Sequence, residues 1–228
     1  MRKFLAIVLL LILAVGIAQS IGKIPFGTSK TKVGRYYIDN GVEETGATNI
    51  VTSVVVNYRG FDTLGEVTVL FVAALGLGAV LALKKKKQEN DELERASLVL
   101  TSGCKFLFPF ILLFGSYIFI HGHLTPGGGF QGGAVIASAF LLIYLGCRER
   151  KINENGAKAI ESLSGLLFVV IGLIGLAVGG YFLLNYLPKG IPNTLFSAGI
   201  IPIIYIAIGF KVGAELTGII DNLMEAED

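Results

Sequence analysis

Long apolar runs dominate this sequence, and about six of them are long enough to cross a lipid bilayer. A hydrocarbon core of about 30 Å needs roughly 20 helical residues, because an α-helix rises about 1.5 Å per residue. The runs occupy residues 4–21, 67–83, 105–121, 129–147, 162–187 and 195–220. The sequence therefore predicts an all-α, polytopic membrane protein with about six transmembrane helices.

Composition agrees with this fold class. Hydrophobic residues make up 53% of the chain, charged residues 16%, and the mean hydropathy is +0.71, which is far more apolar than a soluble domain. The net charge of +2 is too small to indicate a nucleic-acid partner. Cys104 and Cys147 form neither a CxxC motif nor a disulfide framework, so we expect packing roles for them and no metal site or bound cofactor in this chain.

The first apolar run is either a signal peptide that is cleaved or a transmembrane span that is retained. It follows Met1-Arg2-Lys3, and Ala18-Gln19-Ser20 could pass for a signal-peptidase site. We expect a retained span, because the chain begins at Met1.

Basic residues orient the predicted spans. Short cytoplasmic loops carry an excess of Lys and Arg. With both termini cytoplasmic, thirteen of the 19 Lys and Arg residues fall on the inner side. Most of the outer ones lie on a long polar excursion over residues 23–62, where the rule is weak. The sequence therefore predicts a multi-pass protein of the cell membrane with both ends inside.

The polar excursion contains one amphipathic stretch and leads into the second span. Its apolar residues recur at helical spacing, which indicates an interfacial helix, although their β-branched character would also suit a strand. These residues are Ile50, Val51, Val54, Val55 and Tyr58, with Asn49, Thr52, Ser53 and Asn57 opposite them. At the start of the span, Thr63-x-x-Glu66 matches a capping box, which would explain Glu66 without ion transport.

Both histidines of the chain lie in one glycine-rich turn, residues 121–133 (His-Gly-His-Leu-Thr-Pro-Gly-Gly-Gly-Phe-Gln-Gly-Gly). Pro126 and the glycines after it must end one span before another begins. Gly127-x-Gly129-x-x-Gly132 has the spacing of a dinucleotide-binding loop, but no strand precedes it. His121 and His123 lie two residues apart with no Cys, Asp or Glu nearby in sequence, so they do not form a zinc site by themselves.

The same turn resembles the signature of the MnhB family, the B-type component of Mrp-type multisubunit cation/proton antiporters. The similarity covers about residues 98–218 and ends in Gly213-Ala214-Glu215-Leu216-Thr217-Gly218, which looks like the last-helix motif of that family. The resemblance implies a subunit of a larger ion-translocating assembly.

A second resemblance covers the front of the chain. Residues 57–66 (Asn-Tyr-Arg-Gly-Phe-Asp-Thr-Leu-Gly-Glu), with Asn49-x-x-Thr52 before them, are similar to the carboxy-terminal part of the large A-type antiporter component and to the E-type component of membrane-bound hydrogenases. In those families the glutamate corresponding to Glu66 is thought to take part in ion movement. We therefore divide the chain into a hydrogenase-E-like region (1–88), a charged cytoplasmic linker (89–104) and an MnhB-like domain (105–228). Separate chains are the expected family pattern, so the fusion is a departure.

The ionisable residues in or near the spans are the candidates for an ion path. They are Glu66, Asp62, His121, His123, Lys211 and Glu215. None falls near the middle of a predicted span, so the chain is not expected to provide a complete path alone. Lys211 could instead snorkel to the inner surface with Glu215 as its i, i+4 partner. In the fifth span, Gly172, Gly175 and Gly179 predict a face for close helix packing.

These features favour a non-catalytic subunit of an Mrp-like sodium/proton-translocating module that carries Na+ or H+. The module would be a free-standing antiporter or part of a ferredoxin-driven respiratory complex, such as a membrane-bound hydrogenase or a sulfur-reducing relative, with other membrane subunits and the bilayer as partners. The alternative is a structural scaffold subunit without ion-path residues. An intramembrane hydrolase is disfavoured, because both histidines lie in one surface turn.

The orientation predicts which loops are accessible from outside. Single cysteines placed at Gly27 and Pro192 should react with an impermeant thiol reagent in sealed, right-side-out vesicles, and a cysteine at Asn90 should react only after permeabilisation. Labelling at Asn90 in intact vesicles would show that the orientation is wrong.

Overall fold

The computed structural model describes residues 2–22, 32–82, 96–147 and 153–227, and every element in them is a helix. The helices, in chain order, are α1 (Arg2–Gly22), α2 (Lys32–Thr45), α3 (Ile50–Thr52), the π-helix η1 (Ser53–Tyr58), α4 (Gly60–Ala82), α5 (Leu98–Ile120), α6 (Gly129–Gly146), α7 (Glu154–Gly179) and α8 (Ile201–Glu227). Five of them, α4 to α8, are long and apolar enough to span a membrane. The predicted all-α polytopic membrane fold is confirmed.

The chain forms two compact units, residues 1–36 and 37–228. In the first unit, α1 is a helix of 21 residues. Its described side chains are exposed, and Leu10, for example, is 65% exposed. A helix over the first apolar run is therefore confirmed.

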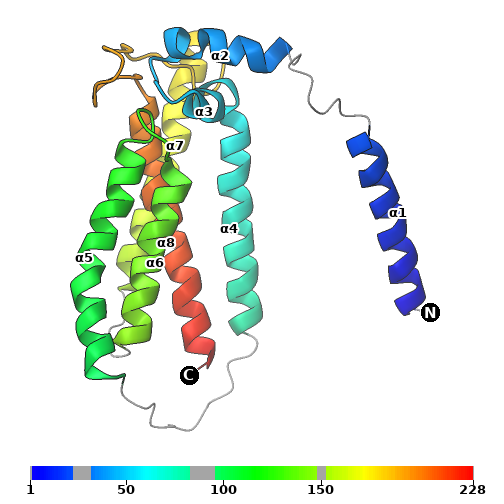
Figure 1. Cartoon of the computed structure of the whole chain (residues 1–228), viewed down its shortest axis with the longest axis vertical. Helices are drawn as coiled ribbons and strands as arrows, with labels where there is room; N and C mark the ends of the chain where they lie inside the picture. Colours follow the sequence, from blue (N-terminus) through cyan, green and yellow to red (C-terminus); the bar gives the residue numbers. More distant parts are fainter. Residues whose placement is uncertain (1, 23–31, 83–95, 148–152, 228) are drawn as a thin grey trace. The chain divides into compact units, whose positions relative to one another are not determined.

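Helix α8 is the centre of the second unit. It packs against α4, α5, α6 and α7 and is 56% buried along its apolar window, whereas α4 is only 6% buried. Ile204, Ile208 and Val212, spaced four residues apart on α8, are each at most 2% exposed. Figure 1 shows α8 lying between the other long helices of this unit. The core of the bundle is thus built around α8, with buried residues of α4, α7 and the connecting segments packed against it.

Glycines bring α5, α6 and α8 into backbone contact. A Cβ added to Gly133 of α6 would lie 2.8 Å from the Gly209 oxygen and 2.9 Å from the Gly213 nitrogen, both on α8. A Cβ on Gly132 would lie 2.7 Å from the Gly115 oxygen on α5. Small residues permit such approach where lipid removes the hydrophobic drive for helix association. The glycines at the start of α6 are therefore packing residues.

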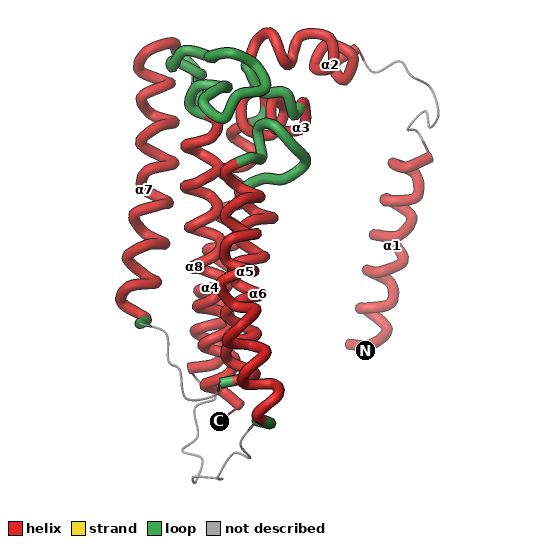
Figure 2. Tube along the Cα trace, turned by 60° about the vertical axis from the view of Figure 1, so that its left-hand side comes forward, coloured by secondary structure: helices red, strands yellow, loops and turns green. Residues whose placement is uncertain are grey.

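The ends of the last two predicted spans are corrected by the structure. Helix α7 stops at Gly179, where Gly180 adopts the left-handed conformation at φ 82°, and α8 begins only at Ile201. Pro188 and Pro192, which cannot donate backbone hydrogen bonds, lie in the loop 180–200 between them. Figure 2 shows this loop at the same end of the bundle as the turn between α5 and α6.

Gly172, Gly175 and Gly179 do form a close-packing face, but not against another helix. A Cβ on Gly175 would lie 2.7 Å from the Leu184 nitrogen, and one on Gly172 would overlap the Phe182 ring. The Leu183 nitrogen also donates to the Gly172 oxygen at 3.3 Å. The glycines of α7 therefore leave room for the chain as it turns back over its own helix. Within the described residues these three glycines contact the following loop and not another helix, and packing against a neighbouring subunit stays a prediction.

The described part of the polar excursion, from Lys32 onward, is largely helical, and it buries polar residues together with Val56. Thr52 and Ser53 are fully buried whereas Val51 is 68% exposed, the reverse of what amphipathicity in water would give. The expected interfacial helix consists of α3 followed by η1, and α2 before it was not predicted. Residues 89–95 of the charged linker, together with Gly27, lie outside the described residues, and its residues from Leu98 onward belong to α5.

The glycine contacts predict that one methyl group at Gly133 destabilises the bundle. We expect Gly133→Ala to lower stability by about 1–3 kcal/mol, the usual range for overpacking, because the backbone of α8 cannot move aside. Gly103→Ala on α5 is the matched control, because nothing lies within 4 Å of its added Cβ. Thermal unfolding in detergent, followed by circular dichroism, measures both variants. Equal midpoints for the two would contradict the packing role.

Candidate functional site

The most unusual side chain in the membrane-spanning region is Lys211, which lies near the middle of α8 and is buried. Its Nζ is 3.1 Å from Oε2 of Glu215, one turn along the same helix, and 3.7 Å from Oε1 of Glu161 on α7. The ring of Phe71 on α4 lies 5.1 Å from the same nitrogen, within cation–π range. The i, i+4 pair with Glu215 is confirmed. Snorkelling is wrong, because only 10% of the Lys211 side chain is exposed.

Glu161 is a member of this cluster that the apolar run alone does not include, because the run begins one residue later, at 162. Helix α7 begins at Glu154, where the side chain of Asn153 caps it by accepting from the Gly156 nitrogen at 3.2 Å. This helix start signal, Asn before a run of helix formers, is present in the sequence and would have placed Glu161 well inside the span. The expectation that no charge lies near the middle of a span is wrong for Lys211 on α8.

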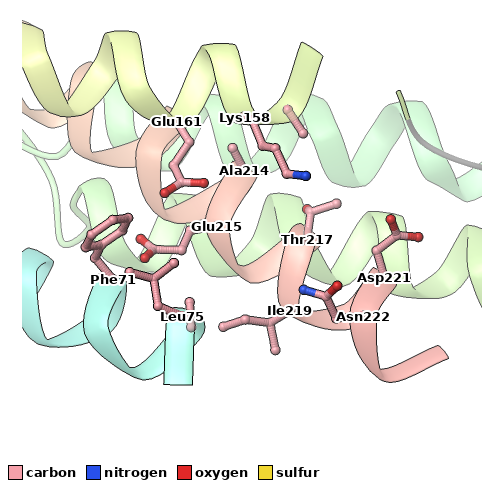
Figure 3. Close-up of a pocket in the computed structure, with 13 residues that line it drawn as sticks. Phe71, Leu75, Lys158, Glu161, Ala214, Glu215, Thr217, Ile219, Asp221 and Asn222 are labelled. Atoms are coloured by element: carbon pink, nitrogen blue, oxygen red, sulfur yellow. The ribbon is translucent and has the colours of Figure 1, made fainter. Parts of the chain in front are cut away.

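A pocket of about 160 Å³ lies beside this ion cluster, between α4, α7 and α8. Glu161 and Glu215 line it together with Lys158 and Asp221, and Figure 3 shows the carboxylates of Glu161 and Glu215 facing each other across it. Asp221 also accepts a hydrogen bond from the Tyr144 hydroxyl at 2.6 Å. The arrangement is a charged cavity within the helix bundle.

The remaining acidic candidates, Asp62 and Glu66, lie apart from this cluster at the start of α4. Asp62 forms an exposed ion pair with Arg59, and Glu66 is exposed on the helix surface. The capping box is wrong, because α4 begins at Gly60 and Thr63 lies inside the helix, where its hydroxyl donates to the Val55 oxygen at 2.7 Å. A capping function therefore no longer accounts for the Glu66 carboxylate.

The histidine turn is held by hydrogen bonds from α3 and its N-cap. The Asn49 side chain donates to the Gly122 and Thr125 oxygens, both at 2.9 Å, and the Thr52 hydroxyl donates to the Gly122 oxygen at 2.7 Å. The Tyr205 hydroxyl donates to Thr52 at 3.0 Å and so extends the network to α8. The polar excursion thus fixes the turn at its end of the bundle.

The two histidines of this turn have different environments. His121 stacks on Tyr117 with the ring centroids 4.3 Å apart. His123 is fully buried, and neither of its ring nitrogens has a hydrogen-bond partner of good geometry among the described residues. Burial lowers the pKa of His123 and outweighs the opposing effect of nearby backbone groups of Thr194 and Leu195. The structure therefore favours a neutral imidazole at this position.

The chain was compared with known protein families, curated proteins and solved structures. The family model described as a domain related to the MnhB subunit of Na+/H+ antiporters matches residues 99–218, more than half of the chain. The chain belongs to the MnhB family. A second model, MbhE of the MBH complex, matches residues 1–96 of this MnhB-type chain.

Relatives of the MnhB-type chain differ in how much of it they match. A protein of Methanocaldococcus jannaschii is 32% identical over 88% of each chain. A Rhizobium meliloti protein, named as the A/B component of a probable K(+)/H(+) antiporter, is 30% identical over 54% of this chain and only 15% of its own length. The Staphylococcus aureus protein named as a putative antiporter component, mnhB2, is 31% identical over 43% of this chain and 68% of its own.

Two solved complexes contain chains of the same fold. One chain in the membrane-bound sulfane sulfur reductase, an archaeal respiratory membrane complex, is 54% identical with a TM-score of 0.81, and the match covers 97% of both chains. A chain in the Mrp complex from Dietzia sp. DQ12-45-1b is 26% identical with a TM-score of 0.73, and the match covers 97% of this chain and 26% of that one. The fusion of the two parts is therefore shared with relatives rather than a departure.

Burial of His123 in the MnhB-type chain predicts a pH-dependent stability. A histidine with a lowered folded-state pKa binds more protons when unfolded, so stability is complete above its unfolded value of about 6.5 and falls as pH drops below it. We expect the thermal unfolding midpoint of the wild type to decrease when the pH is lowered from about 7.5 to about 5.5, and to decrease more than that of His123→Gln, which lacks the imidazole. The free-energy difference from one group is at most about 1.4 kcal/mol per pH unit. Parallel pH profiles for the two proteins would contradict a buried neutral His123.

Proposed function

We propose that this MnhB-type chain is a non-catalytic membrane subunit that handles ions within an Mrp-like sodium/proton-translocating module. The observation that carries the proposal is the buried Lys211 between Glu161 and Glu215. Charged groups at membrane depth cost several kcal/mol and persist where they serve an ion path. Three ionised groups from two helices, around one cavity, supply carboxylates that can exchange a proton or bind a cation.

The module is a respiratory complex of the sulfur-reducing type with other membrane subunits as partners. Identity of 54% to a chain of the sulfane sulfur reductase, over 97% of both chains, supports this choice over a free-standing antiporter. The exposed Glu66 on α4, a helix that is only 6% buried in this chain, is consistent with a surface completed by a neighbouring subunit. In this proposal the complex lies in the cell membrane, and the histidine turn faces outward.

Partner identification tests the assembly. The tagged chain, purified in mild detergent, should carry iron–sulfur subunits with it as well as antiporter-type subunits. Recovery of antiporter-type subunits alone would decide for a free-standing antiporter.

A charge-neutralising substitution tests the ion path. Glu215→Gln removes one carboxylate but leaves Lys211 paired with Glu161, so the folded complex should assemble. We expect sodium-linked transport in vesicles to fall about tenfold or more, equivalent to about 1.4 kcal/mol in the barrier. Asp39→Asn, at an exposed carboxylate on α2, is the control that should transport normally.

Glu66 is tested in the same assay. Glu66→Gln should reduce transport without loss of assembly, because the cap that would explain this carboxylate is absent. Wild-type transport by both Glu215→Gln and Glu66→Gln would instead support a purely structural scaffold.

A further inference from the structure

We propose that the pocket between α4, α7 and α8 binds one monovalent metal cation, Na+, at the Glu215 carboxylate in competition with the ammonium group of Lys211. This inference rests on the proposed function and deepens it, because it assigns a cation-binding site to this chain and names the residue that the cation displaces. The charges, the unpaired atoms and the size of the pocket support it.

The first observation is a charge imbalance. The described charged groups in and beside the pocket are two bases, Lys158 and Lys211, and three acids, Glu161, Glu215 and Asp221. With all five ionised, these described groups carry a net charge of −1. Lys158 is exposed, and Lys211 and Glu215 are the buried members. Uncompensated charge is costly at the buried members, so one additional monovalent cation or one proton can balance the site.

The second observation is that the pocket contains polar atoms with no partner among the described residues. The Glu215 side chain is 1% exposed, and its Oε2 accepts from Lys211 while its Oε1 has no hydrogen-bond partner. Thr217, which is 3% exposed, also lines the pocket and has an unpartnered Oγ1. Leaving a buried polar atom unpaired costs about 1–3 kcal/mol, and more for a charged group. Oxygen atoms in this state are the ligands that hard cations prefer.

The third observation is that the pocket has room for a partly hydrated ion. Its volume of about 160 Å³ far exceeds the about 10–15 Å³ that one water molecule requires. Phe71 and Leu75 of α4 line the same cavity, and Figure 3 shows Phe71 beside the Glu215 carboxylate. A cation at Glu215 can therefore keep water ligands on the open side of the cavity.

Lys211 can yield its place without becoming unpaired. Its Nζ already lies 3.7 Å from Glu161, and its long side chain can move toward that acid when Na+ occupies Glu215. Glu161 then faces Lys211 and Glu215 faces Na+, and the five charged groups and the ion together have a net charge of zero. Lys211 thus acts as a tethered cation that holds Glu215 when no ion is bound.

Binding of radiolabelled Na+ to the purified complex tests this site, with each variant measured against the wild type at about pH 8, where carboxylates of ordinary pKa are ionised. The wild type should bind one more Na+ per copy of this chain than Glu215→Gln does, and Asp39→Asn should bind as the wild type. Lys211→Met removes the competing ammonium, so its Na+ affinity at this site should rise roughly tenfold. A folding defect cannot produce tighter binding, so this variant keeps the test decisive.

Two results would overturn the inference. These are an unchanged Na+ stoichiometry in Glu215→Gln, and a Lys211→Met complex that binds Na+ no more tightly than the wild type. If Glu215→Gln abolishes transport but not Na+ binding, the proposed function stands and the site exchanges protons alone. If Glu215→Gln abolishes binding but transport is normal, the cation site stands and the ion-path function is wrong.

Discussion

A charge inside a membrane-spanning bundle must be paired, and in this chain that requirement joins the two sequence halves. Lys211 is held by an acid on its own helix, by Glu161 on α7 and by the face of Phe71 on α4. Because Phe71 comes from the hydrogenase-E-like part and the other two from the MnhB-like part, the cluster depends on both. Loss of either helix would leave a buried ion without its full set of partners, which is a far larger penalty than loss of an apolar contact.

Glycine determines how near the helices can come to support this cluster. The contacts of Gly132 and Gly133 bring α6 against α5 and α8 at backbone distance, so α8 is fixed on one side by close packing. Its other side carries the polar groups and the cavity. One side of this helix is therefore packed closely against α6 at its glycines, and the other side is charged, so side chains on the charged side can move while the backbone stays in place.

The sequence predicted the fold class well, because length and apolarity of a run depend on the bilayer and not on tertiary detail. Helix ends were less predictable. Parts of the loop 180–200 are apolar enough to extend two spans, although Gly180 ends α7 in the left-handed conformation and Leu183 and Leu184 pack back on α7. The candidate site was half predicted: Lys211 and Glu215 were found by their i, i+4 spacing, whereas Glu161 depends on a contact between helices. Likewise, burial of Thr52 depends on its contact with the histidine turn, and burial of Ser53 on its contact with Thr45 at the end of α2.

The hydrogen bonds from Asn49 and Thr52 to the histidine turn join two parts that need not belong to one polypeptide. The match to the Staphylococcus aureus relative covers 68% of that protein but only 43% of this chain, so it is too short to include both parts in full. In a fused chain the same polar contacts form within one molecule, where the effective concentration of one part near the other reaches the millimolar range for a short connection. Contacts too weak to assemble two free subunits are then sufficient, and the two parts are always made in equal numbers. Fusion therefore allows this junction to remain polar and adjustable, whereas two separate subunits would need a larger apolar interface to stay together.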